Sequence, residues 1–362
     1  MIKEVKLVEN EYNVVSLFSG CGGLDLGLKQ AGFNIIWAND FDKSAVEIYK
    51  HNIGNIIHGD IRDINENDIP ECDVIVAGFP CQPFSSAGNR LGVNDERGNM
   101  YLECLRIINA KKPKVVIFEN VRGILSSKNN DGSLLIHSII GMLESIQPGY
   151  TVKYKLLKAS DYGVPQNRYR VVFVAFRNDL LVNYEFPKPT YSSDDERLKV
   201  GSIINVPENL ENQNEVWEFS PQSKVLIPFI KEGGSWKDIP YEILPLRLKK
   251  IRDDMKKYRA PNFYRRFARN EINGTITASA TPENCGIIHP TQNRRYSVRE
   301  IARIQSFPDD FIFVGDSIPN KYKVIGNAVP PLLGKIIGIS IKDKLDEALS
   351  EINVTKQIKF DI

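Results

Sequence analysis

The first half of the chain alternates between short apolar runs and segments with the spacing of amphipathic helices. Runs that predict strands lie at 13–18, 33–40, 55–60, 73–79, 114–120 and 168–176. Helical spacing lies between them, at 24–31, 42–52, 99–111 and 134–146. Strands separated by helices of this length are typical of a doubly wound sheet, so the pattern predicts an α/β fold with a mostly parallel sheet.

The periodicity weakens near Phe186-Pro187-Lys188-Pro189 and stays weak to about residue 320. This stretch is rich in Asn, Glu, Pro, Lys and Arg, which predicts a smaller, irregular domain over 186–322. Helical spacing returns from Pro331 onward.

Composition limits the classes of protein that fit this pattern. Lys and Arg number 47 and Asp and Glu 45, a net charge of +2, so any nucleic-acid surface must be a local patch. The five cysteines form no C-x-x-C pair, so neither a disulfide framework nor a metal site is expected. Residues 1–12 lack the apolar region of a signal peptide, and no apolar run approaches the ~20 residues that span a bilayer. The sequence predicts a cytoplasmic protein without a membrane segment.

A glycine turn, Phe18 to Gly23, follows the first strand and precedes a helix, where a ligand can approach the backbone closely. The dinucleotide fingerprint G-x-G-x-x-G fails because Asp25 replaces its third glycine. Asp40 and Asp60 follow the next two strands, and a carboxylate after the second strand commonly binds a ribose. The set predicts an adenosine-bearing ligand without a pyrophosphate. As an alternative, Asp40 caps the helix that starts near Asp42.

Cys81 and Glu119 follow two buried strands directly. Carboxyl ends of parallel strands meet at one sheet edge, so a thiol and a carboxyl group are expected to face one crevice. That is the arrangement of a nucleophile with an acid. The structural alternatives are a packed cysteine and a glutamate that ends a turn.

Basic residues mark two further segments. Arg168 and Arg170 alternate on a strand, so both point to one side, where they can bind a carbonyl oxygen or phosphate. An exposed edge pair is the alternative. Residues 247–269 carry ten Lys or Arg against two Asp, with four Tyr or Phe among them. This mixture favours nucleic acid, whereas the alternative is a solvated helix face.

In their order along the chain, these motifs resemble the cytosine-C5 DNA methyltransferases. The match covers nearly the whole chain and comprises the glycine turn, Pro-Cys-Gln (80–82), Glu-Asn-Val (119–121), Gln-x-Arg-x-Arg (166–170), Arg-Glu-x-Ala-Arg (299–303) and Gly-Asn-Ala-Val (326–329). The resemblance implies methyl transfer from S-adenosylmethionine to carbon 5 of a flipped-out cytosine in duplex DNA, through a covalent bond between Cys81 and C6. One departure is Cys21 after Gly20, where a small or apolar residue often stands.

The resemblance also implies roles for individual residues. Asp40 would bind the donor's ribose, Phe41 would contact its adenine ring and Asp60 would lie near the adenine amino group. The implied donor site comprises Phe18, Gly20, Gly22, Gly23, Leu24, Asp40, Phe41, Asp60, Ile61, Pro80, Met100, Asn327 and Val329. Glu119 would bond N3 and the exocyclic amine of cytosine. Arg170 would hold its O2 carbonyl, with Arg168 in support.

For the target, the resemblance implies DNA contacts by Gln82, Ser85, Arg97, Arg265, Arg266 and Thr277. It further implies a discontinuous catalytic domain, 1–185 plus 323–362, with the variable recognition region within 186–285. A bacterial or phage modification enzyme of this kind is expected to be monomeric and to have a cognate restriction endonuclease.

Three other classes of protein also fit parts of this sequence. The nearest is a transfer-RNA cytosine-C5 methyltransferase, but the Cys-Phe-Thr tripeptide typical of that sister family is absent. A catalytically inactive nucleic-acid-binding relative is disfavoured by the intact Cys81, Glu119 and Arg170. A dehydrogenase is disfavoured by the failed glycine fingerprint.

Overall fold

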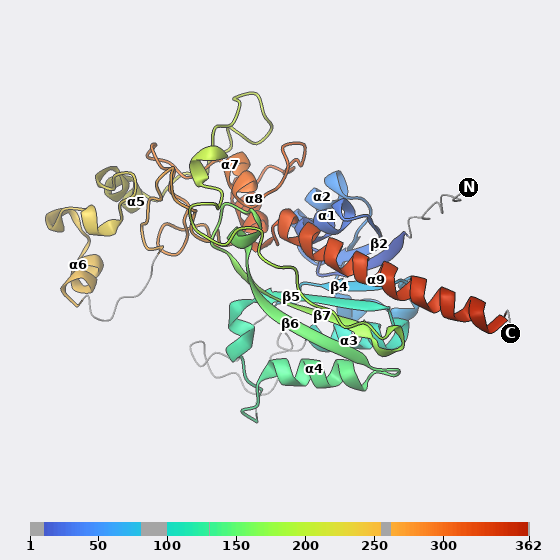
Figure 1. Ribbon diagram of the computed structural model, residues 1–362. Helices are drawn as coiled ribbons and strands as arrows, with labels where there is room; N and C mark the ends of the chain where they lie inside the picture. Colours follow the sequence, from blue (N-terminus) through green and yellow to red (C-terminus); the bar gives the residue numbers. More distant parts are fainter. Residues whose placement is uncertain (1–10, 81–99, 130, 255–261, 361–362) are drawn as a thin grey trace.

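The computed structural model describes residues 11–80, 100–129, 131–254 and 262–360, with side chains to 352. Its centre is a seven-stranded sheet with the order β3-β2-β1-β4-β5-β7-β6 (Figure 1). Only β7 runs antiparallel to its neighbours, β5 and β6. The predicted mostly parallel sheet is therefore confirmed. The strands are β1 (Tyr12–Leu17), β2 (Phe33–Asp40), β3 (Ile57–His58), β4 (Val74–Ala77), β5 (Val115–Val121), β6 (Tyr150–Lys158) and β7 (Tyr169–Arg177).

The edge strand β6 was not predicted from the sequence. Its sequence, YTVKYKLLK, carries three lysines and is largely exposed between its ends. Charged side chains on an edge protect it from pairing with other chains, and they also remove the apolar run that marks a buried strand.

Helices cover both faces of the sheet (Figure 1). On one face, α1 (Gly23–Gln30) and α9 (Pro331–Phe360) pack against alternate side chains of β1, β4, β5 and β7. On the other face, α3 (Met100–Lys111) and α4 (Leu135–Ser145) pack against the intervening side chains. α2 (Lys43–Asn52) follows β2. Side chains that alternate between two buried faces explain the continuous apolar runs of the central strands.

The contact between α1 and α9 requires glycine. A Cβ atom on Gly27 would lie 2.3 Å from the carbonyl oxygen of Pro331. The stretch Ile318–Ile352 is long and apolar enough to cross a membrane by length and composition, but 61% of its most apolar window is buried inside the protein. Leu333, Ile337 and Ile341 pack into the core beside α1, so its apolar character serves the interior.

A second hydrophobic core is formed mostly by residues 200–325, as Phe219 and Trp236 illustrate, and it also includes Cys21, Ala45 and Ile48 of the first half of the chain. Its helices are α5 (Pro221–Leu226), α6 (Leu246–Asp253), α7 (Val298–Ile304) and α8 (Ile318–Asn327). Between 186 and 322 the described residues contain isolated β-bridges but no β-strand, in keeping with the predicted irregular character. The predicted domain boundary at 322 falls inside α8, a helix missed because Pro319, two lysines and Gly326 obscure its apolar spacing.

Candidate active site

The glycine turn forms an open cradle at the carboxyl end of β1. Phe18, Gly20 and Gly22 have positive φ angles of 54°, 57° and 89°, a conformation that favours glycine. A Cβ atom built on Gly20 would meet nothing within 4 Å, whereas one on Gly23 would lie 2.3 Å from the carbonyl oxygen of Val329. The turn is therefore open at Gly20 and closed at Gly23 by the Gly-Asn-Ala-Val segment.

Asp40 binds the glycine turn rather than capping α2. Its carboxylate accepts hydrogen bonds from the backbone N–H of Gly20 at 2.7 Å and of Asp42 at 2.8 Å. The cap of α2 is Asp42, which accepts from Ala45 N–H. Burial raises the pKa of Asp40, and the adjacent Phe41 is 76% exposed. An open glycine turn, a fixed carboxylate and an uncovered aromatic ring fit an adenosine-bearing group.

The other predicted donor residues lie around the same sheet edge. Asp60 already pairs with Arg62, with Nη2 to Oδ2 at 2.7 Å, and this contact lowers the pKa of Asp60. An adenine amino group would therefore share Asp60 with a guanidinium. The remaining predicted residues comprise buried Leu24, Ile61, Met100 and Val329, together with exposed Pro80 and Asn327.

Glu119 and Arg170 form a buried ion pair at the end of β5. The antiparallel register pairs Val121 with Arg170, which brings Glu119 Oε1 to 2.6 Å from Arg170 Nε. Burial raises the pKa of Glu119 despite the opposing charges of Arg170 and Arg168. The carboxyl group therefore keeps a proton to higher pH than a solvated glutamate does.

The chain leaves β4 beside this ion pair. A Cβ atom on Gly78 would lie 3.4 Å from Glu119 Oε2. Asn120 Nδ2 donates to the carbonyl oxygen of Phe79 at 3.0 Å, and the rings of Phe79 and Phe118 meet edge to face. These contacts fix the backbone next to Glu119 two residues before Cys81 in the sequence. Cys81 itself, with Gln82, Ser85 and Arg97, lies outside the described residues.

The four cysteines of the described part are poor candidates for a nucleophile. Burial raises the pKa of Cys21 and of Cys72 to about 12 and that of Cys285 to about 11. The pKa of Cys104 is raised as well. A thiolate is the reactive form, so these groups are inert near neutral pH.

Arg168 does not join the ion pair of Glu119. It is 1% exposed and donates to the carbonyl oxygens of Ile276 at 2.8 Å, Gly326 at 2.8 Å and Ala328 at 2.9 Å. Its guanidinium is occupied by backbone, so we treat it as a positioning residue rather than a group that contacts cytosine.

The predicted DNA contacts in the small domain differ in accessibility. Arg266 is 3% exposed and donates to the carbonyl oxygens of Ile227, His289 and Gln292, which removes it from the candidate DNA contacts. Arg265 is half-buried and pairs with Glu271 at 2.6 Å. Thr277 is half-buried, and its hydroxyl group shares a hydrogen bond with Ser279. A run of basic residues in the sequence could not distinguish these environments.

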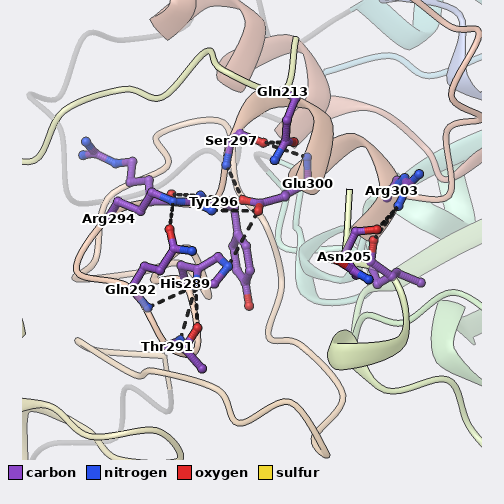
Figure 2. A network of polar contacts seen from close by, with 12 residues as sticks. Asn205, Gln213, His289, Thr291, Gln292, Arg294, Tyr296, Ser297, Glu300 and Arg303 are labelled. Atoms are coloured by element: carbon purple, nitrogen blue, oxygen red, sulfur yellow. Dashed lines mark hydrogen bonds and ion pairs between the residues drawn. The ribbon is translucent and has the colours of Figure 1, made fainter. Parts of the chain in front are cut away.

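The Arg-Glu-x-Ala-Arg motif holds the small domain together (Figure 2). Glu300 accepts from Arg294 at 2.6 and 2.8 Å and from Ser297 N–H at 2.7 Å. His289 Nδ1 accepts from the backbone N–H groups of Thr291 and Gln292, and burial lowers the pKa of His289 to about 4. The ring is therefore neutral near pH 7. The network is structural.

Two residues of the sequence motifs acquire roles that sequence reasoning missed. Gln166, which is fully buried, accepts from Ile276 N–H, and Asn120 anchors Phe79. Gln166 belongs to the Gln-x-Arg-x-Arg motif and Asn120 to the Glu-Asn-Val motif. Their place within these motifs is the only feature of the sequence that could have indicated a role for them. Among the described residues, no group of three or more His, Cys, Asp and Glu side chains could hold a metal ion.

The sequence matches known proteins over most of its length. The family model for C-5 cytosine-specific DNA methylase matches residues 12–343. The chain is 41% identical over 339 residues to the Type II methyltransferase M.NgoFVII of Neisseria gonorrhoeae, covering 91% of this chain and 86% of that protein. It is 34% identical to M.NgoPII of the same organism, over 93% and 97% of the two chains.

A solved structure shares the fold. The Entamoeba histolytica methyltransferase EhMeth superposes with a TM-score of 0.63 at 20% identity, covering 93% of this chain and 99% of that one. The family match over nearly the full length, together with the glycine turn and the Glu119–Arg170 pair, leads to one conclusion. The chain belongs to the C-5 cytosine-specific DNA methylase family, and it is a DNA methyltransferase.

Proposed function

We propose that this enzyme methylates carbon 5 of a flipped-out cytosine within a specific duplex DNA sequence, through a covalent bond between Cys81 and C6. The observation that carries the proposal is the buried Glu119–Arg170 pair, at 2.6 Å, beside the backbone that leads into Cys81. The glycine turn follows β1, and Asp40 is the last residue of β2. Because β1 pairs with both β2 and β4, these groups lie at the same edge of the sheet as the end of β4.

The chemistry explains why these residue types are needed. Carbon 5 of cytosine is a poor nucleophile, and addition of the Cys81 thiolate to C6 makes C5 enamine-like. The new S–C6 bond pushes electron density toward N3, where a protonated Glu119 can donate its proton. Arg170 would stabilise O2 and orient Glu119. After methyl transfer a base takes the C5 proton, the C5–C6 double bond re-forms as the S–C6 bond breaks, and N3 returns its proton to Glu119, so that the Cys81 thiolate is regenerated.

S-adenosylmethionine, the donor that the family implies, supplies an electrophilic methyl group when it is bound. The open turn at Gly20, the carboxylate of Asp40 and the exposed ring of Phe41 would hold its adenosine part. Asn327 and Val329 would close the site from the C-terminal segment, because Val329 packs directly on Gly23.

The target must leave the double helix to reach this edge, at a cost of a few kcal/mol. We assign recognition to residues within 186–285, with Thr277 and the predicted residues Gln82, Ser85 and Arg97 contacting the DNA. The catalytic domain comprises 1–185 and 323–362. The relatives named as Type II methyltransferases support a restriction-modification role. We extend the proposal to a monomeric cytoplasmic enzyme with a cognate endonuclease.

The product identifies the reaction. Purified enzyme is incubated with a tritiated donor and duplex DNA, the DNA is digested, and the labelled nucleoside is separated. We expect 5-methylcytosine, and bisulfite sequencing then locates the modified site. A label on an exocyclic amine, or label only on transfer RNA, would overturn the proposal.

A further inference from the structure

A buried polar clamp joins the segment that contains Thr277 to the end of α8. Gln166 and Arg168, on the approach to β7, hold both polar groups of the Ile276 backbone. Ile276 N–H donates to Gln166 Oε1 at 2.8 Å, and Ile276 C=O accepts from Arg168 Nη1 at 2.8 Å. Both side chains are buried, at 0% and 1% exposure.

The same two side chains reach the last carbonyl groups of α8. Arg168 Nη2 donates to Gly326 and Ala328, and Gln166 donates to Gln305, which in turn donates to Ile325 C=O at 2.7 Å. The last carbonyls of a helix have no partner within it, and a cation at that end is favoured by the helix dipole. The clamp therefore sets where α8 ends.

The segment with Thr277 and the end of α8 also pack directly against each other. A Cβ atom on Gly326 would lie 2.4 Å from the backbone of Thr277. Thr277 follows Ile276, while Asn327 and Val329 follow Gly326. A displacement of the segment with Thr277 must therefore move the segment with Asn327, or break the clamp.

We propose that Arg168 is a positioning residue that couples the DNA-contacting segment at Thr277 to the donor-binding segment at Asn327–Val329. Binding of duplex DNA then changes the affinity for the donor, and the donor changes the affinity for DNA by the same factor. This inference rests on the proposed function, which places DNA at Thr277 and the donor at Asn327 and Val329.

The test measures that coupling factor in the full-length enzyme. The probe is S-adenosylhomocysteine, titrated by calorimetry with and without a duplex that contains the methylated site. The ratio of the two dissociation constants is the coupling factor, and measurable coupling between sites is typically about 5- to 150-fold. For the wild type we expect a factor of this order. For Arg168→Lys and for Gly326→Ala we expect a factor near one.

The two variants act differently on the same contact. Arg168→Lys removes the fork that binds carbonyls of both segments, while Gly326→Ala drives the segments apart by a Cβ atom. Their effects on the coupling factor should not add, because either change already uncouples the segments. Should one variant fail to fold, the other still gives the result.

Arg299→Lys is the matched control. Arg299 is also fully buried and donates to backbone carbonyls, those of Glu211, Pro308 and Phe311, but it touches neither coupled segment. We expect lower thermal stability with the wild-type coupling factor.

Three results would overturn the inference: a wild-type factor of one, an unchanged factor in both test variants, or an equal loss in the control. Failure of the proposed function would appear separately, as the absence of 5-methylcytosine from the wild-type reaction.

Discussion

Arginine has different tasks at the edge of the sheet and in the small domain. At the sheet edge, strand pairing satisfies most of the backbone, and Arg170 pairs with the carboxylate of Glu119. In the described part of the small domain, loops replace strands. Arg265 and Arg294 pair with glutamates there, but other arginines donate to main-chain carbonyls. Arg266, Arg299 and Arg303 all do so.

The difference follows from the rule that buried backbone groups must be hydrogen-bonded. A chain without strand ladders leaves carbonyls for side chains to satisfy, and the guanidinium group has five donors for them. A basic small domain is therefore weak evidence for a basic surface. Arginines that hold the loops must be separated from those that face solvent before any is assigned to DNA.

The sheet edge gives the largest expected effect. For Glu119→Gln we expect the rate of methyl transfer to fall by about 10²–10³, the typical loss when one stabilising donor is removed from a reacting centre. DNA affinity should change little, because the proposed mechanism gives Glu119 no contact with DNA other than the reacting base. Single-turnover rates and DNA dissociation constants measure the two separately. Equal losses of rate and DNA affinity would mean that Glu119 has a structural role, as the buried arginines of the small domain do.

A buried acid on the sheet side predicts a pH dependence of stability. Asp25 accepts from Ser16 and Tyr49, and burial raises its pKa to about 6. The folded state therefore holds the proton more tightly than the unfolded chain, so this stability is present below pH about 4 and lost as the pH rises through about 6. The loss is about 3 kcal/mol for a shift of this size.

Urea unfolding between pH 4 and 8 checks this dependence. We expect the stability of wild type relative to Asp25→Asn to decline over that range. A difference that is constant with pH would mean that Asp25 titrates normally despite its burial.

Within the small domain, Arg266→Leu tests the structural role of a buried arginine. The change leaves the carbonyls of Ile227, His289 and Gln292 without their donor, and we expect a stability loss of about 2 kcal/mol. The salt dependence of DNA binding should stay unchanged, because the guanidinium is not available to phosphate. If the variant keeps the stability of the wild type but the slope of log K for DNA binding against log salt is reduced, Arg266 contacts DNA after all.

The smallest effect belongs to an exposed arginine of the same basic segment. Arg247 lies on α6 and is exposed, so Arg247→Gln should leave stability unaltered. If this face meets DNA, the slope of log K against log salt should decrease by about 0.9, the value for one phosphate contact. An unaltered slope would place α6 away from the DNA, and the basic segment would then serve folding and solubility alone.

The central fold was predictable from the sequence because its strands are buried on both sides. After the initial Asp73 and Lys114, the runs at 73–79 and 114–120 are apolar up to Phe79 and Phe118, and the strand end that follows is also where ligands bind in such sheets. The same periodicity placed Glu119 at the edge. The exposed strand β6 and the helix α8 were not predicted, because polar residues interrupt the apolar spacing of both segments.

The roles of individual arginines could not be predicted, because they depend on contacts distant in sequence. Arg168 meets carbonyls 108 and 158 residues away, and no local pattern specifies such partners. Alternation on a strand predicted that Arg168 and Arg170 share a side, but not that one pairs with Glu119 and the other with backbone. Likewise, the charge run at 247–269 carried no information on which of its members are buried.

Covalent trapping tests the central claim most directly. A duplex with 5-fluorocytosine at the target position has no removable C5 proton, so the enzyme should remain bound through sulfur after methyl transfer. Mass spectrometry of the digested complex is expected to place the adduct on Cys81, and Cys81→Ser should form no adduct while still binding S-adenosylhomocysteine. An adduct on another residue, or 5-methylcytosine formed by Cys81→Ser, would contradict the account.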